Sequence, residues 1–264
     1  MTTVQTIRRC VLPACIAMAV LVAPHAALAQ TAPTSAGAVE PKLIEDLIAA
    51  NRILVEKGVI DIRGHVSVRH PRDPSRFLMS RAIAPELVSA GDIIEYDLDG
   101  RAVNANGRES FSERFIHSEI YRARPDVMSV VHAHTPSVVA FSVSEVPLRP
   151  VIISANFIGE GVPAHQNGEF GGGVGRAELG RALAATLGKG PAVMMRGHGM
   201  VAVGYSLPSA IGRSVYLDVN AQIQSRAIAL GGKVTHNRPL AEASIANNPF
   251  DREWEAWRKK ALAR

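Results

Sequence analysis

The segment Val130-Val131-His132-Ala133-His134-Thr135 joins an apolar run to two histidines that are one residue apart. In a β-strand, alternate side chains face the same side of the sheet, so His132 and His134 would point the same way. Zinc and related divalent metals bind neutral imidazole nitrogens readily. The pair therefore indicates half of a metal site at the end of a buried strand. The alternative is two ordinary polar residues at a strand end.

Length and composition indicate a globular protein. The chain has 264 residues, of which 47% are hydrophobic and 20% are charged, enough apolar material for a sizeable core. The formal net charge of +5 is spread along the chain, without a basic block or a patch of interleaved aromatic and basic residues. We therefore expect no nucleic-acid partner.

The first 29 residues are typical of a secretory signal peptide. Arg8-Arg9 supply the positive region, residues 11–22 the short apolar region, and Ala27-Leu28-Ala29 an A-x-A cleavage site. We expect a mature protein that begins at Gln30 and is periplasmic or secreted, by the general secretory or the twin-arginine route. The alternative, a buried N-terminal helix, is disfavoured because prolines interrupt the segment.

Removal of this signal changes the inventory of the chain. The mature protein would keep 27 Lys and Arg against 24 Asp and Glu, a net charge of +3. Both cysteines, Cys10 and Cys15, would be lost, so any metal must be held by histidine and carboxylate. We expect residues 30–40 to form a linker and residues 41–264 one domain, with no membrane contact after cleavage.

The domain alternates short apolar strands and amphipathic helices. The patterns predict strands at 60–69 with a bend at Gly64, and at 76–80, 93–98, 127–134, 151–153, 192–195 and 200–204. They predict helices at 41–57, after an N-cap at Ser112, at 136–143, at 177–187, at 208–230 with Ser206 as cap, and around Trp254 and Trp257. The glycine-rich residues 159–175 lack the strand and helix context of a dinucleotide site, and we interpret them as a surface loop.

A third histidine, His198, lies between Gly197 and Gly199 at the end of an apolar strand. If that strand and the 127–134 strand are neighbours, His198 can join His132 and His134 around one metal. Three protein ligands leave a coordination position open, as in catalytic metal sites. Glu113, at the start of the preceding helix, is the candidate for proton transfer.

Together these motifs resemble the class II aldolase/adducin family, from about residue 43 to residue 232. The landmarks are Gly64-His65-Val66-Ser67-Val68-Arg69, Ser112-Glu113, His132-Ala133-His134 and Gly197-His198-Gly199. The resemblance implies a fuculose-phosphate aldolase-like α/β fold, with three α/β/α layers around a central, mainly antiparallel sheet. It implies a homotetramer with the site near a subunit interface. It also implies a divalent metal, Zn²⁺ first and Mn²⁺, Co²⁺ or Fe²⁺ as alternatives, on His132, His134 and His198, with Glu113 catalytic.

The chain departs from the sugar-phosphate members of that family at their phosphate-binding positions. It has Gly64-His65 where they have Gly-Asn, Ser80-Arg81-Ala82 where they have a Thr-Gly or Ser-Gly loop, and Ser110-Phe111-Ser112 where they often have adjacent serines. These differences favour an unphosphorylated acid, held by His65, Arg81 and Ser112.

The resemblance then implies a carbon–carbon lyase that acts on a hydroxy-, keto- or hydroxyaromatic acid. A metal-stabilised enolate would be left by decarboxylation or by retro-aldol cleavage. The alternatives are a sugar-phosphate aldolase or epimerase, an Fe(II)-dependent oxygenase, a non-catalytic adducin-like protein, and an exported protein that only captures an acid.

Overall fold

A computed structural model describes residue 2 and residues 33–166, 173–237 and 250–263. Residues 32–264 form one unit, separate from residues 1–31. The predicted signal peptide, apart from Thr2, lies outside the described residues.

An eight-stranded sheet is the centre of this unit, in the order β4-β3-β2-β1-β5-β8-β7-β6. Neighbouring strands are antiparallel except β6 and β7, which are parallel. The strands are β1 (His65–Arg69), β2 (Arg76–Ser80), β3 (Ile93–Asp97), β4 (Ala102–Val103), β5 (Ser129–Ala133), β6 (Ala164–His165), β7 (Ala192–Met195) and β8 (Gly199–Gly204). The predicted mainly antiparallel sheet is confirmed.

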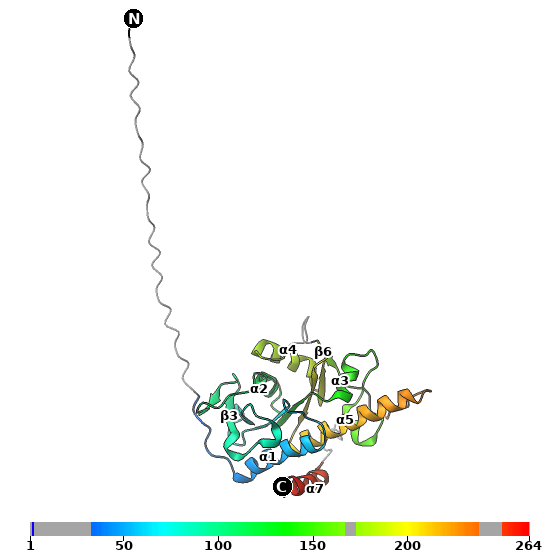
Figure 1. Ribbon diagram of the computed structural model, residues 1–264, viewed down its shortest axis with the longest axis horizontal. Helices are drawn as coiled ribbons and strands as arrows, with labels where there is room; N and C mark the ends of the chain where they lie inside the picture. The colour runs from blue at the N-terminus through cyan, green and yellow to red at the C-terminus, as the bar shows by residue number, and fades with distance from the viewer. Residues whose placement is uncertain (1, 3–32, 167–172, 238–249, 264) are drawn as a thin grey trace. The chain divides into compact units, whose positions relative to one another are not determined.

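Two hydrophobic cores lie on opposite faces of the sheet, because successive strand residues alternate between them. Val131 and Ala133 of β5 belong to one core, whereas Val130 belongs to the other. Helices α1, α3 and α5 cover the first face, with α7 packed against α1 and α5, and α2 and α4 pack together on the second. Figure 1 shows these layers on either side of the sheet, so the three-layer α/β/α arrangement is confirmed.

The helices begin and end close to the predicted residues. They are α1 (Pro41–Glu56), α2 (Arg114–Ala123), α3 (Pro136–Ser142), α4 (Ala177–Leu187), α5 (Leu207–Ala229) and α7 (Asp251–Leu262). Proline at the first turn of α1, α3 and α5 is compatible with a helix start, where its missing N–H would have no helical partner. Ser206 caps α5 as predicted, with its side chain accepting a hydrogen bond from the Ser209 amide.

Four local predictions were wrong. Residues 60–64 form a turn, so β1 begins only at His65. Residues 151–153 do not form a strand, and a 3₁₀ helix, η3 (Ile153–Ile158), begins there. The glycine-rich loop contains β6, and its residues 167–172 lie outside the described part. Glu113 rather than Ser112 occupies the N-cap position of α2.

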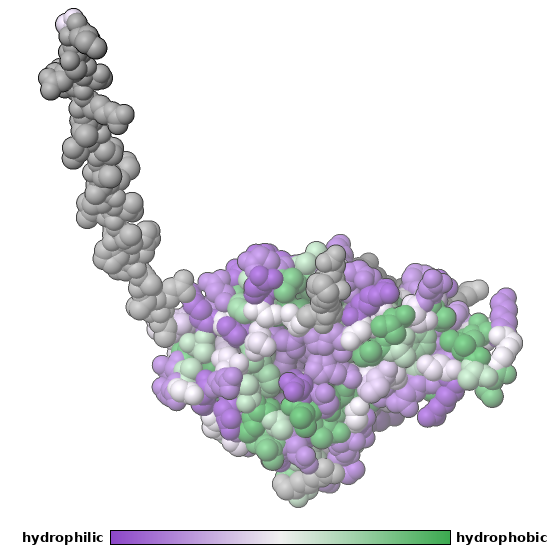
Figure 2. Space-filling view, turned by 45° about the horizontal axis from the view of Figure 1, so that its top comes forward, coloured by the Kyte–Doolittle hydropathy of each residue, from purple (hydrophilic) through white to green (hydrophobic). Residues whose placement is uncertain are grey.

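Hydrophilic and hydrophobic residues are interspersed on the face of the protein that Figure 2 shows. Large apolar side chains with more than half of their surface exposed are Ile62, Leu87, Val143, Ile153 and Leu230. Within the described ranges, no helix is both long enough and apolar enough to cross a membrane.

Candidate active site

The end of β5 brings His132 and His134 together, with their Nε2 atoms 3.1 Å apart, as their spacing predicted. His132 pairs with His65 of β1 on one side and with Val201 of β8 on the other. It shares its face with Val130, whose side chain belongs to the core under α2 and α4. His134 follows just past the end of the strand.

The turn between β7 and β8 brings in His198. These strands pair through Met195 and Gly199, so residues 196–198 form a tight reversal. Gly197 has a φ of +65°, a conformation that favours glycine. A Cβ at Gly199 would lie 2.3 Å from the Ala133 carbonyl oxygen and 3.2 Å from His134. The two glycines therefore let this turn approach the end of β5, as the sequence indicated.

The three imidazoles converge on one point. The Nε2 atom of His134 lies 3.1 Å from the Nε2 atoms of both His132 and His198. His132 is fully buried, whereas the other two rings are partly exposed. One ligand atom from each ring and one carboxylate oxygen of Glu113 all lie within 4.8 Å of one another.

In His132 and His134, the hydrogen bond made by Nδ1 determines whether Nε2 is a donor or an acceptor. His132 Nδ1 lies 3.1 Å from the Met200 carbonyl oxygen, which can only accept, so Nδ1 carries the proton. His134 Nδ1 lies 3.2 Å from both carboxylate oxygens of Asp61. Neutral rings of this tautomer point two Nε2 lone pairs at each other. A divalent cation between them would relieve that repulsion, and outer hydrogen bonds of this kind are typical of histidine metal ligands.

Glu113 completes the cluster from the start of α2. Its carboxylate oxygens lie 3.3 Å from His132 Nε2 and 3.5 Å from His198 Nε2. Burial would raise the pKa of Glu113, but the adjacent His132, His198 and the Val174 N–H together lower it to about 2. The Val174 amide donates to this carboxylate at 3.0 Å. Glu113 is therefore ionised at neutral pH.

The residues present fit a divalent cation. Burial, together with His132, lowers the pKa of His198 to about 4, so its imidazole is neutral at pH 7, the state that binds a metal. His198 Nδ1 is buried without a hydrogen-bond partner among the described residues. Three imidazoles and one carboxylate are a donor set that zinc and its neighbours accept.

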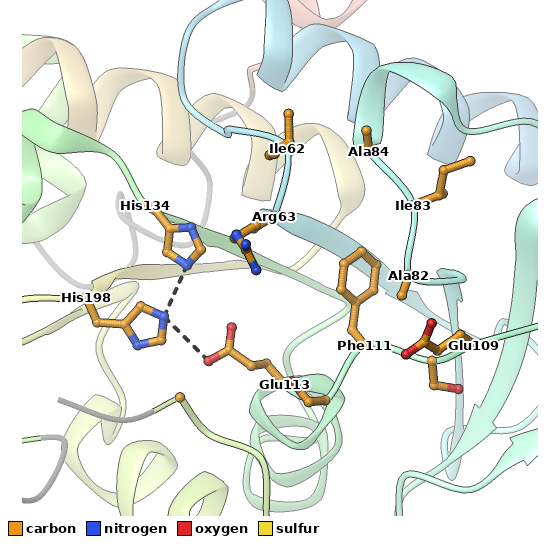
Figure 3. Close-up of a pocket in the computed structure, with 13 residues that line it drawn as sticks. Ile62, Arg63, Ala82, Ile83, Ala84, Glu109, Phe111, Glu113, His134 and His198 are labelled. Carbon is orange, nitrogen blue, oxygen red and sulfur yellow. Dashed lines mark hydrogen bonds and ion pairs between the residues drawn. The ribbon is translucent and has the colours of Figure 1, made fainter. Parts of the chain in front are cut away.

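A cavity of about 660 Å³ opens above the cluster. Figure 3 shows His134, His198 and Glu113 on one side of it and Phe111 with Ala82, Ile83 and Ala84 on the other. The lining residues are Ile62, Arg63, Ala82, Ile83, Ala84, Glu109, Ser110, Phe111, Ser112, Glu113, His134, Gly173 and His198. The site is thus a pocket with a polar floor and a largely apolar wall.

Of the three residues predicted to bind substrate, only Ser112 is among the described residues that line the cavity. His65 is buried behind it, 1% exposed, with its ring between those of Phe111, His117 and His132. Arg81 lies just outside the lining, and its Nε atom is 2.6 Å from Asp92 Oδ1. Substrate binding by His65 and Arg81 remains a prediction that this geometry does not favour.

Sequence reasoning missed the residues that surround the cluster. His117 of α2 links His65, at 2.7 Å, to Ser67, at 2.6 Å, and Ser67 continues to Tyr121. Burial lowers the pKa of His117 to about 3 and that of His65 well below its ordinary value, so both are neutral. The spacing of His65 and Ser67, two residues apart on one strand, was the only sequence signal for this buried chain.

The Class II Aldolase and Adducin N-terminal domain matches residues 45–225. The chain belongs to the class II aldolase/adducin family. A structure of an aldolase II superfamily protein from Pseudomonas syringae is similar with a TM-score of 0.71 and 26% identity, over 85% of this chain and 95% of that one.

Two relatives carry the functional comparison. The decarboxylase tropJ of Talaromyces stipitatus is 36% identical over 204 residues, 71% of this chain and 77% of that protein. The 3,4-dihydroxyphthalate decarboxylase of Arthrobacter keyseri is 30% identical over 237 residues, 83% of this chain and 92% of that protein. With the fold, they identify this chain as a lyase, and the prediction of a lyase is confirmed.

Proposed function

We propose that the protein is a divalent-metal-dependent decarboxylase of an unphosphorylated hydroxyaromatic acid. The observation that carries the proposal is the cluster of His132, His134, His198 and Glu113 at the base of a pocket whose largely apolar wall includes Phe111. Two similar proteins are decarboxylases, and the name of one states a dihydroxylated aromatic diacid as substrate.

The opposite wall of the pocket supports an unphosphorylated substrate. Ala82, Ile83 and Ala84 supply no side-chain hydroxyl, and the Ala82 N–H already donates to the Glu109 carbonyl at 2.8 Å. A phosphate cradle needs several free N–H and hydroxyl donors close together. An aromatic ring, by contrast, can pack between these apolar residues and Phe111.

The chemistry follows from the site residues. A divalent cation on the three histidines would supply Lewis-acid polarisation of two substrate oxygens. The Glu113 carboxylate, which is ionised before substrate binds, would take the proton of the substrate hydroxyl and return it to the ring carbon that bears the carboxylate. The bond to that carboxylate breaks, carbon dioxide leaves, and the electron pair returns to the ring, whose oxygen finally takes a proton from solvent.

A turnover screen tests the proposal. The mature protein, loaded with Zn²⁺ or Mn²⁺, is offered dihydroxyphthalates, dihydroxybenzoates, small hydroxy- and keto-acids, and sugar phosphates. The release of carbon dioxide, the release of aldehyde and the uptake of oxygen are measured separately. We expect carbon dioxide from a hydroxyaromatic acid without oxygen uptake and with loss of activity in chelator. Aldehyde release alone would identify a retro-aldol enzyme instead, and oxygen uptake an oxygenase.

A further inference from the structure

We infer that Arg63 binds a second carboxylate of the substrate, so that the pocket selects hydroxyaromatic diacids over monoacids. This inference rests on the proposed function and concerns the carboxylate that stays on the ring, not the one that leaves. Arg63 lines the same cavity as the histidine and glutamate cluster. Figure 3 shows its side chain reaching into the space between His134 and Phe111.

The turn before β1 fixes the place of Arg63. Asp61 Oδ1 accepts hydrogen bonds from the backbone N–H groups of Arg63, at 2.9 Å, and Gly64, at 3.0 Å. The same carboxylate holds His134 Nδ1 at 3.2 Å. One carboxylate therefore ties the Arg63 backbone to a histidine of the cluster. A Cβ at Gly64 would lie 2.7 Å from Ile60 Cβ, so this tight turn requires glycine.

The Arg63 guanidinium has no ion-pair partner among the described residues. Asp61, the nearest carboxylate in sequence, is already bound by two amides and His134. The contrast with Arg81 is direct, because Arg81 pairs with Asp92 at 2.6 Å. A guanidinium that faces a cavity with its donors free can bind a carboxylate bidentately.

The charges of the cavity explain why a diacid would need this residue. Arg63 is the only lysine or arginine among the described lining residues, and the carboxylates of Glu109 and Glu113 face the same cavity. A second substrate carboxylate in this space would be repelled by these two groups without a cation beside it. A substrate with one carboxylate, used at the cluster, would leave Arg63 to water and gain nothing from it.

Two matched ligand pairs test the inference. The substrates 3,4-dihydroxyphthalate and 2,3-dihydroxybenzoate differ only in the carboxylate that stays on the ring. Their decarboxylation products, 3,4-dihydroxybenzoate and catechol, differ in the same way and do not react further by this route. We compare metal-loaded wild-type protein, Arg63→Met, Arg63→Lys and the control Arg252→Met, which removes an exposed arginine of α7 outside the cavity lining.

Calorimetric binding of the products is the first readout. We expect wild type and Arg252→Met to bind 3,4-dihydroxybenzoate about 10- to 100-fold more tightly than catechol, the range for charge-assisted hydrogen bonds. Arg63→Met should bind 3,4-dihydroxybenzoate no more tightly than catechol, because Glu109 and Glu113 then repel the carboxylate without a cation beside it. Arg63→Lys should keep part of the preference. Catechol affinity and metal content should not change in any variant, because Arg63 is not in the metal cluster.

The second readout separates this inference from the proposed function. If neither substrate releases carbon dioxide but the product preference depends on Arg63, decarboxylation is refuted and the carboxylate subsite stands. If carbon dioxide is released but Arg63→Met keeps the preference for the diacid, the inference is overturned and decarboxylation stands. A wild-type protein without any preference, or an equal loss for both members of each pair, also overturns it.

Discussion

Three imidazoles facing one another are the most informative residues of this protein. The Nε2 contact of 3.1 Å between His132 and His134 joins two acceptors in the tautomers favoured by the Met200 carbonyl and Asp61. Such an arrangement is stable only with a proton or a cation at its centre. Burial disfavours extra positive charge on the rings, as the lowered pKa of His198 shows. A divalent cation is therefore the occupant that satisfies the most groups.

The first prediction concerns metal content. His198→Ala should strip most of the bound metal, because one of three imidazole ligands is lost. The matched control is His165→Ala on β6, whose imidazole bonds to Thr186 outside the cluster and should not affect metal content. Elemental analysis of both purified variants decides. A stoichiometric metal in His198→Ala would remove that residue from the site.

The second prediction separates Glu113 from the histidines. Glu113→Gln keeps the size of the side chain and one oxygen, but it cannot carry a proton. We expect metal content close to that of wild type and turnover lowered about 10²- to 10⁴-fold, the range for losing general acid–base catalysis. Steady-state rates and elemental analysis on the same samples measure both. Loss of metal together with activity would make Glu113 a fourth ligand, and normal turnover would exclude the proton transfer.

At the scale of elements, the contact between α2 and α4 positions Glu113. The two helices pack closely on the second face of the sheet, and Gly180 of α4 is buried at their contact. A Cβ there would lie 2.4 Å from the Phe115 carbonyl oxygen of α2 and 2.9 Å from Glu119 Cγ. A backbone carbonyl cannot move aside as a side chain can, so the helices must separate to admit a methyl group.

The third prediction uses this contact. Gly180→Ala gains up to about 1 kcal/mol of helix propensity, but overpacking against backbone costs about 1–3 kcal/mol. We expect a net destabilisation and a loss of turnover, because α2 carries Glu113. Denaturant unfolding measures the free energy. Gly175→Ala is the control, since a Cβ there would meet nothing within 4 Å, and it should change stability by less than about 0.5 kcal/mol. Equal stability of the two variants would contradict this account.

At the scale of the whole molecule, the unit that carries the site is residues 32–264. The proposed signal peptide ends at residue 29, close to this boundary. Export would deliver a protein without cysteine, whose candidate metal ligands are histidines and a carboxylate and cannot be lost to disulfide formation. The homotetramer that the family resemblance implies stays a prediction, which sedimentation of the mature protein can test.

The fourth prediction concerns that boundary. N-terminal sequencing of the native protein should find Gln30 as the first residue, in the extracytoplasmic fraction. Arg8→Lys with Arg9→Lys keeps the positive charge, so it should block export only if the twin-arginine route is used. A full-length chain retained in the cytoplasm would refute both the cleavage site and the location.

Sequence alone determined most of the architecture. Strand and helix periods are local properties, so the elements on both sides of the sheet and the Ser206 cap were predicted from spacing. The convergence of the three histidines was also predictable, because His132 and His134 lie two residues apart at a strand end and glycines flank His198. The strand predictions for 60–64 and 151–153 were wrong because the same apolar residues can be accommodated in other local structure. Asp61 closes a turn by accepting from the Arg63 and Gly64 amides, and a 3₁₀ helix begins at Ile153.

Only the tertiary structure decided which charged residues reach the cavity. Arg63 lies in the turn before β1, and Arg81 directly follows β2. Asp92 binds the Arg81 side chain, whereas Asp61 accepts a hydrogen bond from the Arg63 backbone and leaves its side chain in the cavity lining. Asp61 and His134 are 73 residues apart, and no local pattern predicts their contact. Sequence spacing therefore predicted which three histidines come together, because two lie at the end of one strand and the third in a glycine turn. Whether an arginine is available to bind substrate depends on whether a carboxylate distant in sequence pairs with its side chain in the folded protein.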